Sequence, residues 1–392
     1  MRVLISCTPG LGHFHPVVPL AEALRTAGHD VAFATSTSFG PTVEDAGFRA
    51  FPVGPDWVET HADDVLPGFL SATADVHTRL FAEIAGRGTV DDLVQVIAEW
   101  HPDVVARTPM EFAAWPAAEL TGRPHVVVGF MVPLQPGLVA LWAGEELRVL
   151  LERAGAAPDP TLARMSGELY LDLMPPVLLP YEWPLPPVHQ VVRPSIAQAR
   201  TRTPPPWLAG YERPIVLVTF GTIFNRSPEL WRATVTALAD LPVDVVATVG
   251  KGRPVPDVGP VPPNLRFEEY VDLAALLPRC AAVVTHGGYG TVVAALLHGV
   301  PMCCIPVTAD NPVNAFAVEQ VGAGVACTTG LLESIPIGFT DPALLTADVV
   351  RDALTALLDD PSYRSRAQEL GSTIAALPPL DVAVDRLVAL TS

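Results

Sequence analysis

Short apolar runs alternate with amphipathic segments along the first part of the chain. The predicted strands there are residues 3–7, 31–35, 104–106 and 125–129. Helices are predicted at residues 16–27 and 110–121. Buried strands that alternate with helices are typical of a doubly wound parallel sheet, so this part of the sequence predicts an α/β domain.

The alternation weakens at residues 56–89 and again at residues 131–174. Both segments carry large apolar side chains, among them Phe69, Phe81 and Trp142. We interpret them as loops and helices above the sheet that form the walls of an apolar substrate site. The alternative is that they are additional helices that only extend the hydrophobic core.

Prolines dominate residues 175–214, so this stretch is not expected to form a regular helix or a central strand. Beyond it the alternation resumes, which predicts a second doubly wound domain. The predicted strands there are residues 215–219, 243–249, 281–284, 302–305 and 324–327. In order along the chain, we expect a first Rossmann-like domain, a proline-rich linker, a second Rossmann-like domain and a last helix. One option for the last helix is that it packs on the first domain. These parts are residues 1–195, 196–213, 214–376 and 377–392.

Length and composition agree with two domains and exclude several classes of protein. A chain of 392 residues is too long for one ordinary core. The net charge of −18 argues against nucleic-acid binding. No apolar run approaches the ~18 residues that a membrane span needs, and the first residues do not resemble a signal peptide. The five cysteines lack metal-site spacing, which predicts reduced thiols and a cytoplasmic protein.

Residues 283–314 combine two kinds of ligand-binding feature. A predicted strand leads into the glycine-rich sequence HGGYGT, which starts at His286 and opens a helix. Glycines let the backbone come close to a ligand, and the N–H groups and dipole of a helix N-terminus favour phosphate. The next predicted strand leads to Asp310 and Asn311, whose side chains suit sugar hydroxyls. The stretch therefore predicts a nucleotide-sugar site.

HGGYGT, the GVP turn at 299–301 and ADN at 309–311 resemble the donor signature of family 1 glycosyltransferases, and most closely that of bacterial enzymes that decorate natural products. The resemblance implies the GT-B fold, in which two doubly wound Rossmann-like domains face each other across a cleft. It also implies which residues bind the donor. His286 and the backbone at Gly288, Tyr289, Gly290 and Thr291 would hold the diphosphate, and Asp310 and Asn311 would face the sugar.

Other donor contacts follow from the same resemblance. Thr222 lies in a loop that approaches the donor phosphates in the family, although a tight turn with Asn225 in a left-handed conformation is an equal alternative. Tyr270 and Val271 match the segment that binds the base. Ala294 stands where plant members have a glutamate that holds the ribose. Asp310-Asn311 is also one methylene shorter than the Asp-Gln pair of glucose-using members. With these altered contacts a deoxysugar is at least as plausible as glucose, and the nucleotide can be TDP or UDP.

The first predicted strand ends in the loop that reads Gly12-His13-Phe14-His15-Pro16. The family pattern Gly-His-x-x-Pro makes His13 the general base that takes the proton of the acceptor hydroxyl, with Gly12 near the donor and His15 structural. The family places an acid after a strand that matches residues 102–106, and the nearest carboxylate here is Glu111. Glu111 is the expected catalytic partner of His13; the alternative is a first-turn glutamate stabilised by its helix dipole.

The resemblance implies an inverting, metal-independent transfer of a sugar to a hydroxyl of an apolar natural product, without a cofactor. The expected acceptor-binding residues are Phe69, Phe81, Met110, Met131 and Trp142. A homodimer is possible. A nucleotide-sugar epimerase and a non-catalytic auxiliary protein of the same fold stay open as alternatives. A dinucleotide oxidoreductase is disfavoured because the first strand-to-helix turn lacks G-x-G-x-x-G.

Overall fold

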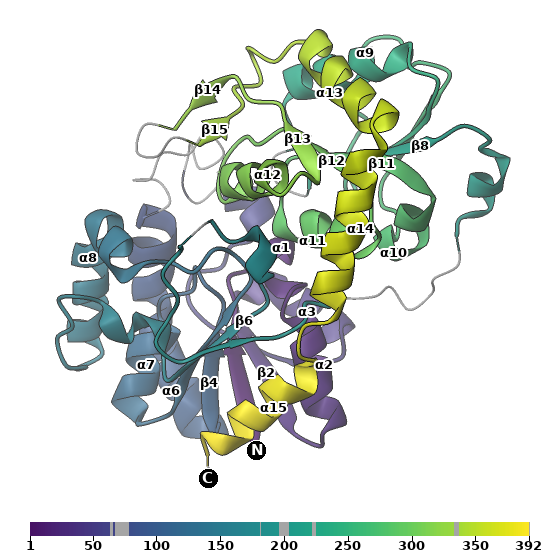
Figure 1. The fold of residues 1–392 in the computed structure, drawn as a ribbon. Helices are drawn as coiled ribbons and strands as arrows, with labels where there is room; N and C mark the ends of the chain where they lie inside the picture. The colour runs from purple at the N-terminus through teal and green to yellow at the C-terminus, as the bar shows by residue number, and fades with distance from the viewer. Residues whose placement is uncertain are drawn as a thin grey trace. The chain divides into compact units, whose positions relative to one another are not determined.

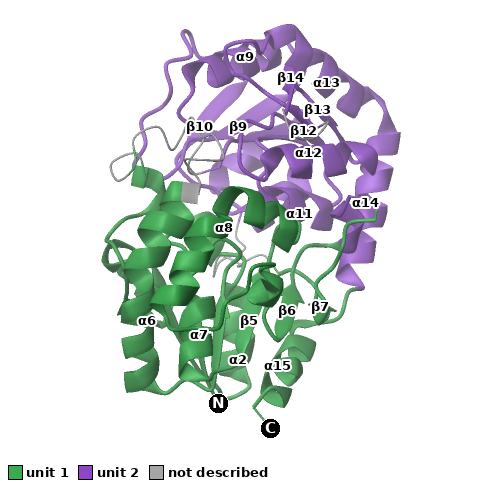
Figure 2. Ribbon diagram, turned by 90° about the vertical axis from the view of Figure 1, so that its left-hand side faces the viewer, with its two compact units in different colours: residues 1–175, 181–195, 377–392 green, residues 176–180, 196–376 purple. Residues whose placement is uncertain are grey.

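The computed structural model describes residues 1–62, 66, 78–180, 182–195, 204–221, 225–332 and 337–391. The chain divides into two compact units, which are coloured separately in Figure 2. Unit 1 comprises Met1–Pro175, Tyr181–Ser195 and Leu377–Ser392. Unit 2 comprises Pro176–Pro180 and Ile196–Ala376.

Unit 1 is built on a parallel sheet with the strand order β3-β2-β1-β4-β5-β6-β7. Its strands are β1 (Arg2–Ser6), β2 (Asp30–Thr35), β3 (Arg49–Pro52), β4 (Val104–Arg107), β5 (His125–Gly129), β6 (Leu169–Asp172) and β7 (His189–Val191). The chain builds outward from β1 to β3 and then returns to the other side of β1 with β4. The loops after β1 and β4 therefore diverge, which leaves room for a ligand at the carboxyl ends of these two strands.

Helices cover the sheet of unit 1 and supply most of its core. They are α1 (Leu11–Phe14), α2 (Val18–Thr26), α3 (Gly40–Asp45), α6 (Arg87–Trp100), α7 (Ala114–Thr121), α8 (Pro136–Arg153) and α15 (Leu380–Ala389). The π-helical segment η4 (Thr78–Gly86) leads into α6, and the short 3₁₀ turn η2 (Glu59–His61) follows β3. The chain ends in α15, which packs on α2 (Figure 1).

Unit 2 repeats this plan with the parallel strand order β10-β9-β8-β11-β12-β13. Its strands are β8 (Ile215–Thr219), β9 (Asp244–Thr248), β10 (Leu265–Glu268), β11 (Cys280–Thr285), β12 (Met302–Cys304) and β13 (Gly324–Ala326), with a separate antiparallel pair of β14 (Gly330–Leu331) and β15 (Gly338–Phe339). Here the order reverses between β8 and β11, so the loops after these two strands diverge.

Side-chain caps fix several helix starts in unit 2. The helices are α9 (Pro228–Ala239), α10 (Leu273–Leu276), α11 (Tyr289–Leu297), α12 (Asn311–Gln320), α13 (Ala347–Asp359) and α14 (Pro361–Ala375). Ser227, Asp272, Thr346 and Asp360 each accept a hydrogen bond from a backbone N–H in the first turn of the helix that follows. The core closes around the buried Trp231 and the apolar faces of the central strands.

Four strands of the two parallel sheets lie outside the sequence prediction, namely β3, β6, β7 and β10, and so does the separate pair β14 and β15. The four sheet strands share a weak sequence signal. Each is short, and β3, β7 and β10 lie at sheet edges, where fewer positions are buried and the apolar pattern is weak. β7 forms inside the proline-rich stretch. Prolines are compatible with an edge strand because only one side of such a strand pairs with a neighbour.

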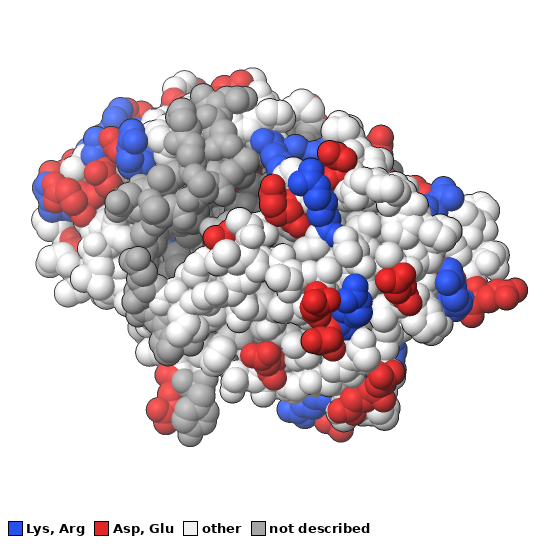
Figure 3. Space-filling view, turned by 90° about the horizontal axis from the view of Figure 1, so that it is seen from above, with Lys and Arg blue, Asp and Glu red and all other residues white. Residues whose placement is uncertain are grey.

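The surface of the described residues agrees with the charge balance of the sequence. On the face shown in Figure 3, blue and red side chains lie in small mixed groups rather than as one continuous basic area. Within the described ranges, no helix is long and apolar enough to cross a membrane. All five cysteines are free and buried.

Candidate active site

Three of the residues that the sequence singled out, His13, Glu111 and His286, lie at the two points where strand order reverses, and so does Gly221. In unit 1, His13 follows β1 and Glu111 follows β4. In unit 2, Gly221 follows β8 and His286 follows β11. Open α/β sheets bind their ligands at the carboxyl ends of strands at such positions. Each unit therefore presents one candidate site of its own.

His13 lies in the single turn of α1 and is held by its neighbour Phe14, which is buried against the rings of Phe33 and Phe39. The imidazole packs against the rings of Phe81 and Phe130, with centroid distances of 6.3 and 5.6 Å. Burial lowers the pKa of His13 to about 4, so this side chain is neutral near pH 7. A neutral imidazole is the form that can accept a proton.

The carboxylate next to His13 belongs to Glu59 in η2, a residue that the sequence did not single out. Its Oε1 lies 3.9 Å from Nε2 of His13, and both side chains are 12% exposed. The Glu59 backbone N–H donates to the carbonyl of Pro9 at 2.8 Å, which ties η2 to the loop after β1. Gly10 completes the fit, because a Cβ at that position would lie 1.9 Å from Oε2 of Glu59.

The contacts of Glu111 agree with the alternative interpretation, in which it is a glutamate at the start of a helix. Its carboxylate accepts hydrogen bonds from the backbone N–H groups of Ala113 and Ala114, at 2.9 and 3.0 Å, where α7 begins. Burial raises the pKa of Glu111, and the nearby Arg107 and these hydrogen bonds oppose the shift. In the described part of the chain no hydrogen bond or ion pair joins Glu111 to His13. The carboxylate beside His13 is therefore Glu59, because the start of α7 occupies both oxygens of Glu111.

Arg107, at the end of β4, fixes the loop that carries Glu111. Arg107 is 2% exposed, and its guanidinium donates to the backbone carbonyls of Thr108, Pro109 and Glu111, and to that of Met165. The sequence signal for this role is a charged residue that ends a buried apolar strand, since such a charge must find partners inside the protein.

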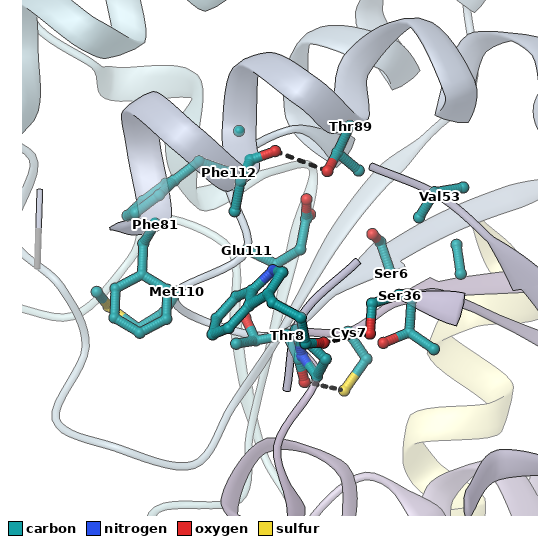
Figure 4. Close-up of a pocket in the computed structure, with 16 residues that line it drawn as sticks. Ser6, Cys7, Thr8, Ser36, Val53, Phe81, Thr89, Met110, Glu111 and Phe112 are labelled. Atoms are coloured by element: carbon teal, nitrogen blue, oxygen red, sulfur yellow. Dashed lines mark hydrogen bonds between the residues drawn. The ribbon is translucent and has the colours of Figure 1, made fainter. Parts of the chain in front are cut away.

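A small cavity of about 30 Å³ lies between the loops after β1 and β4 (Figure 4). That volume holds about two water molecules. Its wall is apolar at Trp57, Phe81 and Met110, and the carboxylate of Glu111 also faces it. The Thr35 hydroxyl, which also lines it, is buried and has no hydrogen-bond partner among the described residues. The cavity can therefore take a small polar group from an otherwise apolar ligand.

The structure brings together only some of the expected acceptor residues. Phe81 and Met110 line the cavity, and Phe81 also touches the imidazole of His13. Trp142 instead packs against Phe112 on the hydrophobic core of unit 1, with ring centroids 6.2 Å apart. Met131 is half-buried after β5 and does not line this cavity. Phe69 lies outside the described residues.

In unit 2, two glycines make the space for the imidazole of His286. A Cβ on Gly221 would lie 2.7 Å from Cε1 of His286, and a Cβ on Gly288 would lie 2.5 Å from Nε2. Gly221 also has a φ of 70°, which most side chains disfavour. Burial lowers the pKa of His286 to about 4, and a hydrogen bond with the Thr219 backbone offsets only part of that shift.

The turn from Gly288 to Thr291 opens helix α11, as the sequence predicts. Gly288 is the residue before the first turn of α11 and contributes no side-chain cap. The N-terminal N–H groups of a helix and its dipole attract anions, and glycine leaves them accessible. Gly290 adds no obstruction either, since a Cβ there would meet nothing within 4 Å. This turn has the features of a diphosphate site.

Asn314, which the sequence analysis did not single out, joins the two halves of the donor signature. Its Nδ2 donates to the carbonyl of Gly287 at 3.0 Å and to the carboxylate of Asp310 at 2.9 Å. Burial raises the pKa of Asp310, and the hydrogen bond from Asn314 opposes the shift. Nδ2 of Asn311 is buried without a partner among the described residues. Buried amides are normally paired, so this donor is available to a ligand or a water molecule.

The remaining donor residues stand apart from that cluster. Tyr270 is 57% exposed after β10, with the ammonium of Lys251 5.3 Å from its ring centroid, and Val271 beside it is buried. Thr222 lies outside the described residues. The proposed left-handed conformation of Asn225 is wrong, because Asn225 does not have a positive φ, whereas Gly221, on the other side of the undescribed residues 222–224, does.

Gly12 is exposed in the first turn of α1, where a Cβ would meet nothing within 4 Å. His15, three residues further along the chain, is also exposed, with its ring centroid 6.1 Å from that of Phe14. A search of the described residues finds no group of three or more His, Cys, Asp or Glu side chains arranged to hold a metal ion.

Comparison with known proteins identifies the family. Residues 22–180 match the N-terminal domain of the erythromycin biosynthesis protein CIII-like family, and residues 232–390 match its C-terminal domain. The chain belongs to the EryCIII-like glycosyltransferases. These are bacterial enzymes of glycosyltransferase family 1, so the resemblance drawn from the HGGYGT, GVP and ADN motifs is confirmed, as is the expected transferase activity.

Individual relatives of this EryCIII-like glycosyltransferase align along nearly its whole length. It is 31% identical to the TDP-daunosamine transferase DnrS of Streptomyces peucetius, over 100% of this chain and 97% of that protein. It is 33% identical to the L-demethylnoviosyl transferase of Streptomyces niveus, over 99% and 98%. The crystal structure of the glycosyltransferase VinC with dTDP superposes with a TM-score of 0.79 at 28% identity and covers 100% and 99% of the two chains. The expected GT-B fold is thereby confirmed.

Proposed function

We propose that this enzyme transfers a deoxysugar from a TDP-sugar to a hydroxyl of an apolar natural product, with inversion at the anomeric carbon and without a metal ion. The relatives support the donor class, since one is named a TDP-daunosamine transferase and another was crystallised with dTDP. UDP stays the alternative nucleotide. The acceptor class rests on the apolar wall of the cavity in unit 1.

His13 is the general base of the proposed reaction. The acceptor O–H bond breaks as its proton passes to the imidazole, and the oxygen attacks the anomeric carbon of the sugar. The bond from that carbon to the diphosphate breaks on the opposite side, which inverts the configuration. The place of His13 after β1, in the family's Gly-His-x-x-Pro pattern, supports this assignment, and burial lowers its pKa so that the imidazole is free to take the proton.

His286 and the N-terminus of α11 stabilise the leaving diphosphate. Its charge grows in the transition state, and fixed N–H groups stabilise such charge without reorganisation. Asp310 and Asn311 follow β12 and face the sugar hydroxyls. Asn314 sets their distance from the phosphate turn through its bonds to Gly287 and Asp310. Tyr270 supports the base, while Phe81 and Met110 contact the acceptor.

The test combines donor binding with transfer. TDP and TDP-deoxysugars should raise the melting temperature more than UDP and UDP-glucose, because a ligand at about 100 times its Kd adds about 2.7 kcal/mol to the folded state. His13→Ala should abolish transfer and keep the shift caused by TDP, since the donor residues other than Gly12 belong to unit 2. Wild-type transfer by His13→Ala, or a product with the anomeric configuration of the donor, would overturn the proposal.

A further inference from the structure

His13 needs a negative charge at its side if it is to take up a proton. The free imidazole is buried, and burial disfavours the cation that forms when the acceptor gives up its proton. The carboxylate of Glu111 is engaged by the backbone N–H groups of Ala113 and Ala114 and makes no ion pair with His13. The charge that offsets the imidazolium has to come from another element.

Glu59 meets this requirement from η2, which follows a different strand. Its Oε1 is 3.9 Å from Nε2 of His13, and both side chains are nearly buried at 12% exposure. At that distance, and shielded from water, opposite charges attract far more strongly than on the surface. Nδ1 of His13 has no hydrogen-bond partner among the described residues. One ring nitrogen therefore faces the carboxylate, and in the proposed reaction the other, which is buried here, takes the proton of the acceptor.

Two features outside the side chains hold Glu59 in this place. The hydrogen bond from its backbone N–H to the Pro9 carbonyl, at 2.8 Å, joins η2 to the loop that carries His13. The carboxylate also lies directly against Gly10, since a Cβ there would lie 1.9 Å from Oε2. The missing side chain of Gly10 therefore leaves the space that the carboxylate of Glu59 occupies. A glutamate on the surface would not need such a space.

We propose that Glu59 is the positioning carboxylate of His13 and stabilises the imidazolium formed during transfer. The proposal rests on the proposed function, in which His13 is the base. The proton that leaves the acceptor hydroxyl ends on His13, and Glu59 keeps its negative charge throughout. Glu59 touches neither substrate, so it acts only through the orientation and basicity of His13.

The titratable groups around His13 and Glu59 come from three segments of the chain: β1, η2 and the loop after β4. The charges of Glu59 and Glu111 both act on Cys7, at the end of β1, whose thiol pKa is raised above its usual range mainly by burial. The thiol of Cys7 is therefore neutral, and the carboxylate of Glu111 is hydrogen-bonded to the start of α7. Glu59 is therefore the group whose removal changes the basicity of His13 most directly.

The test compares Glu59→Gln with Glu59→Asp, with TDP-sugar as donor and a graded series of phenols and aliphatic alcohols as acceptors. Glu59→Gln should lower kcat by about 10- to 100-fold for an aliphatic alcohol. The loss should shrink as the acceptor hydroxyl becomes more acidic, because a weaker base then suffices. KM for the TDP-sugar should stay at the wild-type value. Glu59→Asp keeps the charge and should retain clearly more kcat than the glutamine variant.

Glu44→Gln is the matched control, because it removes the charge of an exposed glutamate on α3. It should leave kcat at the wild-type value. The melting-temperature shift caused by TDP shows that each variant is folded. Equal losses for all acceptors, equal losses in Glu59→Gln and Glu59→Asp, or wild-type kcat in Glu59→Gln would each overturn the assignment. An active His13→Ala would instead overturn the proposed base itself, so the two failures are distinguishable.

Discussion

Replacing Gly288 with alanine tests whether His286 holds the donor diphosphate. Gly288 has φ −64° and ψ 139°, which alanine adopts without strain. The new Cβ, however, would lie 2.5 Å from Nε2 of His286, closer than atoms can approach. The obstacle is the end of a side chain rather than backbone, so the imidazole must move while the turn itself stays in place. The substitution therefore displaces one side chain inside an intact site.

The expected effect on binding is larger than the effect on folding. A hydrogen bond from a side chain to a charged group contributes about 1.5–3 kcal/mol. Losing it should raise the Kd for TDP by about 10- to 150-fold. The cost in folding should be about 1 kcal/mol, since an N-cap glycine is replaced and one ring changes its rotamer.

Isothermal titration calorimetry with TDP measures the first quantity, and thermal unfolding without ligand measures the second. Gly210→Ala is the matched control in the same unit, because a Cβ on Gly210 meets nothing within 4 Å. It should bind TDP as the wild type does. If Gly288→Ala also binds TDP with wild-type affinity, His286 is not a ligand of the diphosphate.

Three further outcomes follow from contacts in the described residues. Asn314→Leu removes the bridge from Gly287 to Asp310 and should lower the unfolding free energy by about 1–3 kcal/mol in denaturant titrations; unchanged stability would contradict the bridge. Burial lowers the pKa of His286 to about 4, so below its ordinary value of 6.5 only the unfolded chain takes up the proton. Relative to His286→Asn, the wild type should therefore lose about 2 kcal/mol of stability between about pH 7 and pH 5, whereas parallel stability curves would refute this. All five free cysteines are buried, so they should react with Ellman's reagent only after unfolding; a fast-reacting thiol in the native protein would contradict this burial.

The central strands could be predicted from the sequence because each is a continuous buried apolar run. β5 and β8 are buried along their whole length, and the prediction gave both with the observed bounds. β3 could not be found in this way. It begins with the exposed Arg49 and ends with Pro52, and it becomes a strand only because β2 pairs with it. Tertiary pairing decides such edge strands, and a single sequence carries little signal for it.

The site shows the same division between local and tertiary information. The HGGYGT turn is local, so its sequence alone indicates the helix start at Tyr289 and the position of His286. The neighbour of His13 is not local. Glu59 reaches His13 only after β3 has paired and η2 has docked on the Pro9 carbonyl, and nothing in the residues around Glu59 indicates this. The family resemblance indicates Glu111 because it is the nearest carboxylate after the strand that matches residues 102–106, but the start of α7 takes its oxygens.

Burial lowers the pKa of both histidines to about 4, yet the two sites use that state in opposite ways. His13 needs its lone pair, so a low pKa keeps it ready at neutral pH, and the charge of Glu59 matters only once the proton has arrived. His286 gains most from a proton, because a cation binds the diphosphate more strongly than a neutral ring does. A bound diphosphate would supply the negative charge that the free site lacks and would raise the pKa of His286. TDP binding should therefore take up a proton through His286. In the proposed reaction the two neutral imidazoles would thus become cations at different stages, His286 on donor binding and His13 on transfer.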